Sequence, residues 1–155
     1  MKKMPKIHLA AAACAFLALG SCNRPPPDGA VRVSDAWVRL PAVKGQPGSA
    51  YFRLEAGSEG TRLTGLSSAL VRRIELHETQ MKGGVARMER KKEVEFPFDG
   101  KLVFEPAGRH AMLFGIDKSV VAGSRIPLTF SFNVAPPVTL DAEVRALGDG
   151  PHEGH

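Results

Sequence analysis

Cysteine is nearly absent from this sequence of 155 residues, and both cysteines, Cys14 and Cys22, lie close to the amino terminus. The rest of the chain therefore has no disulfide, no thiolate nucleophile and no cysteine that could bind a metal ion. A blue-copper electron-transfer protein is excluded as well, because its copper needs a thiolate ligand. Patterns of the Ser/His/Asp or HExxH type are also missing, so we expect no enzyme.

Dense positive charge is a second feature that the sequence lacks. The formal net charge of +5 includes three lysines within the first six residues. Without residues 1–21 the total of Lys and Arg falls from 21 to 18 against 16 Asp and Glu, which leaves +2. No basic patch with interleaved aromatic residues is present, and we therefore expect no binding of nucleic acid. The content of 24% charged and 43% hydrophobic residues is ordinary for a globular domain.

The amino terminus has the pattern of an export signal over residues 1–21. Its lysines precede an apolar run at 7–19 that is too short for a membrane-spanning helix with its own anchors. Residues 19–22 (Leu-Gly-Ser-Cys) resemble a bacterial lipobox, in which Cys22 becomes the lipidated first residue of a membrane-anchored periplasmic protein. The proline-rich residues 22–29 would then be a stiff linker. The alternative is ordinary signal cleavage, with Cys22 near the cut by chance.

No long segment has helical periodicity, and from residue 30 onward short β-type runs alternate with turn residues. Apolar side chains alternate from Ile126 to Phe132, and Gly83-Gly84 predicts a tight hairpin turn. This pattern predicts one all-β domain over residues 30–147, a Greek-key β-sandwich or barrel, and a flexible tail over 148–155. The expected strands are 31–39, 49–56, 61–66, 71–79, 84–90, 101–105, 110–116, 126–134 and 138–146.

Histidine and methionine gather in one part of the chain. All three methionines that follow the signal lie within 35 residues of His77, whereas methionines that only fill a core would scatter more widely. His110 and Met112 are two positions apart, so in a strand they point to the same face. His77 points away from the core side of its strand, and the hairpin turn would bring Met88 back near it. These four residues form a candidate metal site, although each alone is commonly a surface or packing residue.

The type of ligand selects the metal. Thioether sulfur is soft and uncharged, and it is a poor ligand for Zn²⁺, Mg²⁺ or Ca²⁺. It suits Cu(I), and imidazole suits copper too. Methionine forms no disulfide, so a His/Met site can work in an oxidising compartment where a dicysteine site would fail. A neutral site of this kind also avoids tight thiolate bonding, which fits a carrier that must release its ion.

The spacing His77-x10-Met88-x21-His110-x-Met112 resembles the periplasmic copper chaperones of the PCu(A)C family. The likeness extends over residues 30–146, the whole expected domain. A pattern of four residues with both long gaps matched is highly specific. The surrounding sequence is similar as well, at residues 74–79, 83–88 and 102–106.

The resemblance implies a cupredoxin-like β-barrel or sandwich with Cu(I) bound by those four residues. It also implies delivery of copper to the Cu(A) centre of cytochrome c oxidase or to another copper-accepting assembly protein, with a thioredoxin-like partner in some cases. Met81 would be a peripheral neighbour of the site, and His152 and His155 would offer a second, Cu(II) site in the tail. We expect a monomer. Two alternatives stay open: periplasmic copper storage or tolerance, and a structural β-sandwich lipoprotein without metal.

Overall fold

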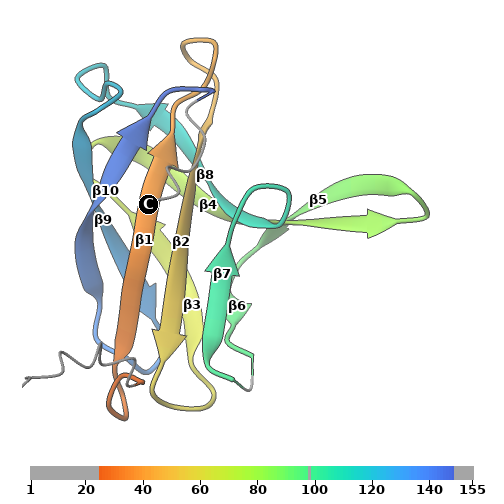
Figure 1. Ribbon diagram of the computed structural model, residues 1–155, viewed down its shortest axis with the longest axis vertical. Coiled ribbons are helices and arrows are strands. Elements are labelled where there is room, and N and C mark those ends of the chain that lie inside the picture. The colour runs from red at the N-terminus through yellow and green to blue at the C-terminus, as the bar shows by residue number, and fades with distance from the viewer. Residues whose placement is uncertain (1–24, 98, 149–155) are drawn as a thin grey trace, which may run out of the picture.

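Strands make up the regular structure of the described residues, 25–97 and 99–148, in a computed structural model (Figure 1). The prediction of an all-β fold is confirmed, and no helix in these two ranges is long and apolar enough to cross a membrane. Nine strands overlap the nine expected ranges, and the short β6 was not expected. The strands are β1 (Val31–Arg39), β2 (Gly48–Ala56), β3 (Arg62–Ser67), β4 (Val71–Lys82), β5 (Val85–Lys91), β6 (Val94–Glu95), β7 (Lys101–Phe104), β8 (Arg109–Ile116), β9 (Arg125–Phe132) and β10 (Val138–Arg145).

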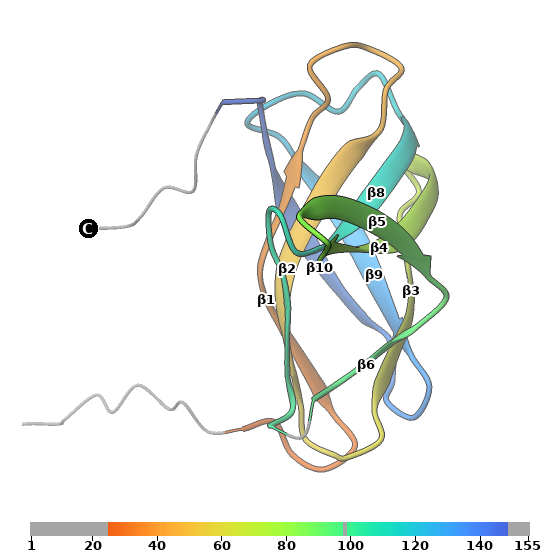
Figure 2. The ribbon, with the colours of Figure 1, turned by 90° about the vertical axis from the view of Figure 1, so that its right-hand side faces the viewer.

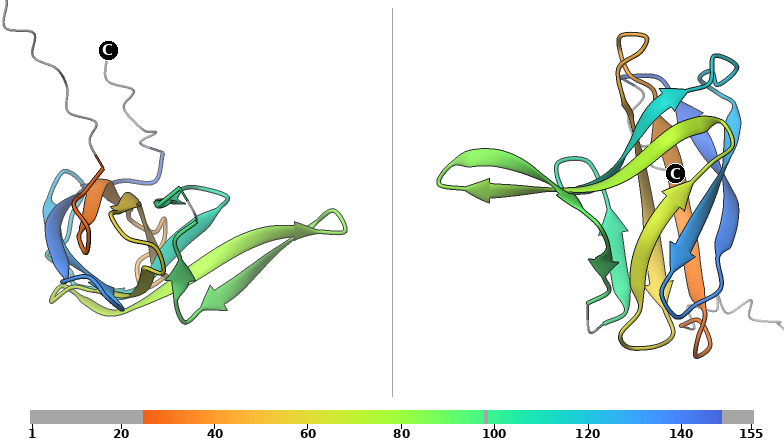
Figure 3. Two further views of the ribbon diagram at one scale, coloured as in Figure 1. Left: turned by 90° about the horizontal axis from the view of Figure 1, so that it is seen from below. Right: turned by 180° about the vertical axis from the view of Figure 1, so that it is seen from behind.

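The strands form one sheet that curls around a common interior (Figure 3). Neighbouring strands follow the order β5-β4-β8-β2-β1-β10-β9-β3-β6, and β7 pairs with the second half of β2. Only β1 and β10 are parallel among these pairs. Pairs such as β4–β8 and β8–β2 join strands that are far apart in sequence. They bring separated residues onto one surface.

Alternating side chains fill the interior of the barrel. In β9, Ile126, Leu128 and Phe130 are fully buried, as the alternation of the sequence predicted. Phe52 stacks on Phe104 with ring centroids 4.3 Å apart and meets the edge of Phe130 at 4.9 Å. These three rings form the centre of the hydrophobic core and give the sheet a firm support.

The β4–β5 hairpin continues beyond the barrel as an arm. Pairing of β4 with β8 ends at Glu78, while its pairing with β5 runs on to the turn at Gly83 and Gly84. Both glycines have positive φ, of 61° and 77°, as a two-residue hairpin turn requires. We call residues 79–88 the arm. Figure 1 shows it projecting sideways, and Figure 2 shows the chain returning from β5 through β6 along the barrel.

The first described residues lie against the barrel. The carbonyl of Pro27 accepts from the N–H of Ala30 across a turn with Gly29 at φ 76°, and Pro26 is buried. The N–H of Gly57, just after β2, donates to the carbonyl of Ala30. The expected linker over residues 22–29 is therefore attached to the domain from Pro26 onward, because its turn is hydrogen-bonded to the β2–β3 connection.

The aromatic centre of the core can be tested by truncation. Phe130→Ala should lower the free energy of unfolding by about 3–5 kcal/mol, because it leaves a cavity beside the ring of Phe52. Val134→Ala, at an exposed position of the β9–β10 loop, should change it by no more than about 0.5 kcal/mol. Equilibrium unfolding in urea measures both values, and similar costs for the two variants would contradict this description of the core.

Candidate metal centre

Strand pairing places the two predicted histidine ligands directly opposite each other. In the antiparallel pair β4–β8, His77 is the partner of His110, and their ring centroids lie 5.9 Å apart with planes inclined by 21°. The preceding pair in β4, Leu76 with Ala111, is buried in the core. Both imidazoles therefore lie on the outer face of the sheet, as the alternation of the sequence predicted.

Both predicted methionine ligands are diagonal neighbours of His77 on that outer face. Met112 is opposite Glu75 across β4–β8, and Met88 is opposite Thr79 across β4–β5. Each is offset from His77 by two residues on an adjacent strand, a separation of about 7–8 Å that long side chains can bridge. The two methionines lie on opposite sides of His77. The pairing thus groups the histidines with Met112 on the barrel, while Met88 approaches from the base of the arm.

A backbone carbonyl sets the tautomer of His110. Nδ1 of this buried ring lies 3.0 Å from the carbonyl oxygen of Gly108. Since a carbonyl oxygen only accepts, Nδ1–H donates, and Nε2 of the neutral ring keeps its lone pair. The same oxygen accepts from the N–H of Thr79 at 3.2 Å. This carbonyl therefore aligns His110 and also ties the base of the arm to the β7–β8 loop.

A carboxylate sets the tautomer of His77. Nε2 of His77 lies 3.2 Å from Oε2 of Glu75, two residues earlier on the same face. An ionised carboxylate only accepts, so Nε2–H donates to it and the lone pair of the neutral ring is on Nδ1. Nδ1 is buried and has no hydrogen-bond partner among the described residues. Buried ring nitrogens normally have a partner, and a bound ion would provide one.

A hydrogen bond from His77 and the charges of two arginines favour the ionised form of Glu75. The hydrogen bond from His77 is the main cause that lowers the pKa of Glu75, burial opposes it, and the charges of Arg90 and Arg73 lower it further. Nε of Arg73 lies 3.2 Å and Nη1 of Arg90 3.7 Å from Oε1 of the same carboxylate. Only 11% of the Glu75 side chain is exposed. The carboxylate is therefore already occupied by three partners and is better suited to orient His77 than to bind a metal itself.

These donors fit a soft metal ion. Each histidine offers one unprotonated nitrogen, and two thioethers lie on the flanks. No group of three or more His, Cys, Asp or Glu side chains that could hold a metal is present in the described ranges. The soft donors nearest the histidine pair by strand pairing are the thioethers of Met112 and Met88. A nitrogen and thioether set of this kind favours Cu(I) over harder cations.

An aromatic surface borders the histidine pair on the side away from the arm. Ala50 of β2 is the partner of Ala111, and the next residue, Tyr51, lies on the outer face against Trp37 with ring centroids 4.5 Å apart. The guanidinium of Arg145 lies over the Trp37 ring, 4.9 Å from its centroid. These residues line a groove of about 720 Å³ that runs over β1, β2, β7 and β10.

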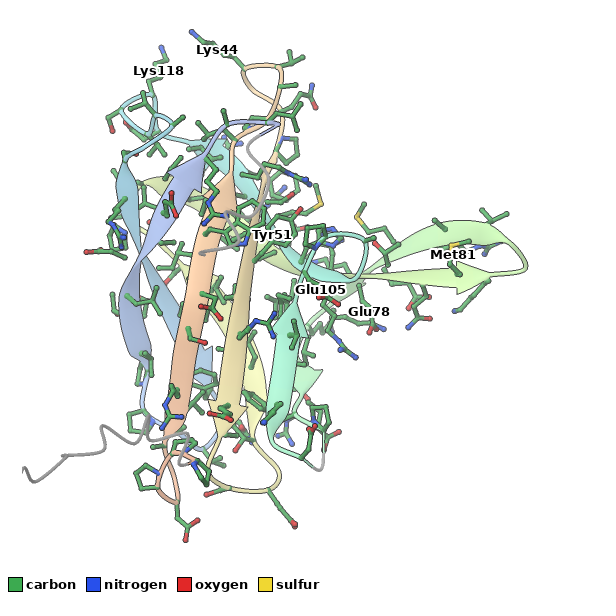
Figure 4. All side chains as sticks on the ribbon, viewed as in Figure 1. Lys44, Tyr51, Glu78, Met81, Glu105 and Lys118 are labelled. Carbon is green, nitrogen blue, oxygen red and sulfur yellow. The ribbon has the colours of Figure 1, made fainter. Side chains whose placement is uncertain are left out.

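The remaining predicted ligands are farther out or not described. Met81 lies two residues beyond Thr79 on the arm, with 68% of its surface exposed, and Figure 4 shows it well away from Tyr51 on the barrel. It does not belong to the histidine cluster. Cys22, His152 and His155 lie outside the described residues, so the lipidation site and the tail site stay predictions.

Glu75 is a residue of the candidate site that the sequence analysis did not identify. Its position two residues before His77 in a strand was a usable signal, because it places the carboxylate on the same face as the imidazole. Its hydrogen bond to His77 also depends on the side-chain rotamer, which the spacing does not give.

The assigned tautomers can be tested without metal. At neutral pH, long-range ¹⁵N–¹H NMR of the apo protein should show His77 protonated at Nε2 and His110 protonated at Nδ1. Glu75→Leu removes the acceptor and should leave His77 as a mixture of tautomers, while Glu75→Gln retains an acceptor oxygen and should preserve the Nε2–H form. His110 is the internal control and should not change. An unaltered His77 in the Leu variant would remove Glu75 from this role.

Two sequence comparisons relate this chain to lipoproteins. A family model described as "Putative lipoprotein LpqE-like" matches residues 31–144. A curated relative, "Putative lipoprotein Lxx21020" of Leifsonia xyli subsp. xyli (strain CTCB07), is 33% identical over 104 residues, which are 66% of this chain. The aligned part makes up 62% of that relative, less than two thirds of its length.

Two solved structures of copper-bound proteins share the architecture. The copper-bound PCuAC domain from PmoF2 matches with a TM-score of 0.63 and 25% identity, over 79% of this chain and 98% of that domain. The solution structure of CuI-DR1885 from Deinococcus radiodurans matches with a TM-score of 0.62 and 23% identity, over 81% of this chain and 83% of that one. The predicted cupredoxin-like fold is confirmed, and the four-ligand site stays a prediction. The match over residues 31–144 shows that the chain belongs to the LpqE-like family.

Proposed function

We propose that this protein is an exported copper carrier that binds one Cu(I) ion through His77, Met88, His110 and Met112. The observation that carries the proposal is the pairing of His77 with His110 on the outer face, where each ring has one nitrogen engaged by an oxygen acceptor. The other nitrogen of each ring is then available to a metal ion. The copper-bound PCuAC domain from PmoF2, with the same fold at 25% identity, supports this choice of metal.

The position of the ligands suits uptake and release. His77 and His110 are anchored in the barrel, whereas Met88 is 54% exposed at the base of the arm. Among the strands that the structure describes, β5 pairs with β4 alone, so a small bend of this two-stranded ribbon would bring the Met88 sulfur over His77 or move it away. Thioether and imidazole ligands bind without deprotonation of a thiol. A partner could therefore displace Met88 first and then take the ion from the remaining ligands.

The place of action follows from the amino-terminal pattern and the relatives. Both the family model and the curated relative carry the word lipoprotein in their names, which supports lipidation of Cys22 and a membrane-anchored position in the periplasm. The resemblance to the PCu(A)C family supports an acceptor of the copper-assembly type, with the Cu(A) subunit of cytochrome c oxidase as the first candidate. A thioredoxin-like partner that keeps the acceptor cysteines reduced fits the same role.

The ligand set can be tested by anaerobic titration with Cu(I) in competition with a chromophoric chelator. The wild-type domain should bind one ion. Met88→Leu and Met112→Leu should each weaken binding by roughly tenfold or more, equivalent to about 1.4 kcal/mol, because leucine keeps the volume but lacks the sulfur. Met81→Leu is the matched control on the same hairpin face and should bind like the wild type.

Two outcomes would count against the proposed ligands. If all three methionine variants bound Cu(I) as tightly as the wild type, Met88 and Met112 would not be ligands. If Met81→Leu alone lost binding, the site would lie farther out on the arm, at Met81. Thermal unfolding of each variant should stay close to that of the wild type, since the three methionines are outside the core.

Delivery and storage can be separated by a transfer experiment. Cu(I)-loaded protein mixed with a reduced, soluble Cu(A) domain should pass its metal to that domain, since a dithiolate site binds Cu(I) more strongly than a thioether and imidazole site. Retention of copper by the loaded protein at equilibrium would instead favour storage or tolerance. Metal analysis after separation of the two proteins measures the outcome.

A further inference from the structure

The segment before β1 is built into the lower end of the barrel. Pro26 is buried, although it belongs to the proline run that the sequence analysis assigned to a linker. The N–H of Gly29 donates to Oγ of Ser58 at 2.7 Å, and the N–H of Gly57 donates to the carbonyl of Ala30 at 3.0 Å. The N–H of Ala30 also closes the turn onto Pro27 at 3.0 Å. The segment is thus held at its carboxyl-terminal side by two hydrogen bonds to residues 57 and 58, and its own turn is closed by the third.

Glycine at position 57 is required by this contact. A Cβ atom built there would lie 2.1 Å from the carbonyl oxygen of Pro27 and 2.6 Å from that of Pro26. The backbone of Gly57 is not in the left-handed region, so its conformation would accept a side chain. The proline segment therefore occupies the space that a side chain at residue 57 would need. The prolines lose little conformational entropy when they pack in this way, because their φ angles are already fixed.

We propose that this docked segment, Pro25–Gly29, fixes the orientation of the domain on the membrane, with the β2–β3 end toward the lipid surface. The proposal rests on the lipidation of Cys22 in the proposed function. Between Cys22 and Pro25 there are three residue steps, at most about 11 Å of chain. A free linker that extended to Ala30 would give eight steps, about 28 Å, and would let the domain rotate freely.

The orientation places the metal centre at a defined height. On β2, Ser49 is opposite Met112, and Gly57 lies eight residues farther along. Eight residues span about 26 Å along a strand, or about 20 Å along the axis of a barrel with typical strand tilt. With the short tether added, Met112 would lie about 20–30 Å above the lipid surface, and the histidine pair somewhat lower. Figure 1 shows the arm leaving the barrel sideways, well above the end that holds the first described residues.

The partner that fits this geometry is itself held at the membrane. A carrier with a fixed height and a sideways arm meets an acceptor whose copper site projects a similar distance from the same bilayer. Such an acceptor is encountered by diffusion in two dimensions, and the short tethers raise its effective concentration. A freely diffusing acceptor would gain nothing from the docked segment.

The orientation can be measured on the apo protein. Cys22 is the only cysteine of the chain from 22 to 155, so its thiol can be coupled to a maleimide-headgroup lipid in phosphatidylcholine vesicles. This recreates the tether whether or not the cell lipidates the residue. A gadolinium-chelating lipid then broadens the amide signals of residues close to the bilayer. The amide of Gly60 should relax at least about tenfold faster than those of Gly45 and Gly123 at the other end, given the roughly 30 Å length of β2 between the ends.

The role of docking is tested with matched glycine variants. Gly57→Ala places a methyl group into the carbonyls of the proline segment and should reduce this gradient several-fold. Gly65→Ala is the control, because a Cβ at residue 65 meets nothing within 4 Å, and it should keep the gradient of the wild type. Unchanged amide spectra of the core in both variants establish that the fold is retained.

Three results would overturn the proposal. These are a flat relaxation profile in the wild type, an unchanged gradient in Gly57→Ala, and a mature protein from its native envelope whose Cys22 carries no acyl chain. The vesicle experiment contains no copper, so its failure leaves the metal site untouched. A failed Cu(I) titration, in turn, leaves the measured orientation as it is.

Discussion

The pairing of β4 with β8 is the constraint on which the candidate site depends. It sets His77 opposite His110 although 33 positions separate them in the chain, and it carries Glu75 and Met112 onto the same face. A slip of one residue in this register would turn both histidines toward the core and Leu76 toward the solvent. The buried Leu76 and Ala111 prevent such a slip. The same hydrophobic alternation that stabilises the sheet therefore also fixes the geometry of the polar cluster.

Local patterns in the sequence predicted most of the fold. Alternation in β9 and the glycines of the β4–β5 turn act over a few residues, and both were assigned correctly. The bulge in β1 was not foreseen. Two residues, Asp35 and Ala36, oppose one residue of β2, and Asp35 has φ 52°. This shift turns Trp37 to the outer face beside Tyr51, which no alternation rule predicts.

The residues of the candidate site could be chosen from the sequence, but their arrangement could not. The spacing of two residues between His110 and Met112 indicates a shared face, whereas the direct pairing of His77 with His110 depends on long-range strand order. The role of Glu75 depends on a rotamer and on two arginines that come from different strands. The hydrogen bond from His77 and those two charges lower the pKa of Glu75, and the ionised carboxylate is a pure acceptor that holds the proton on Nε2 of His77. The free nitrogen of that ring is thus a consequence of three residues outside the motif.

The candidate site combines two anchored histidines with a methionine on an edge strand. The histidines are held by a carbonyl, a carboxylate and the pairing of β4 with β8, while Met88 lies on β5, which among the described strands pairs with β4 alone. A carrier needs this asymmetry, because rigid ligands retain the ion and a movable ligand opens the way to a partner. The docked proline segment adds a second fixed point at the far end of β2, where Gly57 leaves room for it. Under the proposed function and the proposed docking, the arm is the part of the described chain that meets an acceptor, and copper is released through a contact at its base.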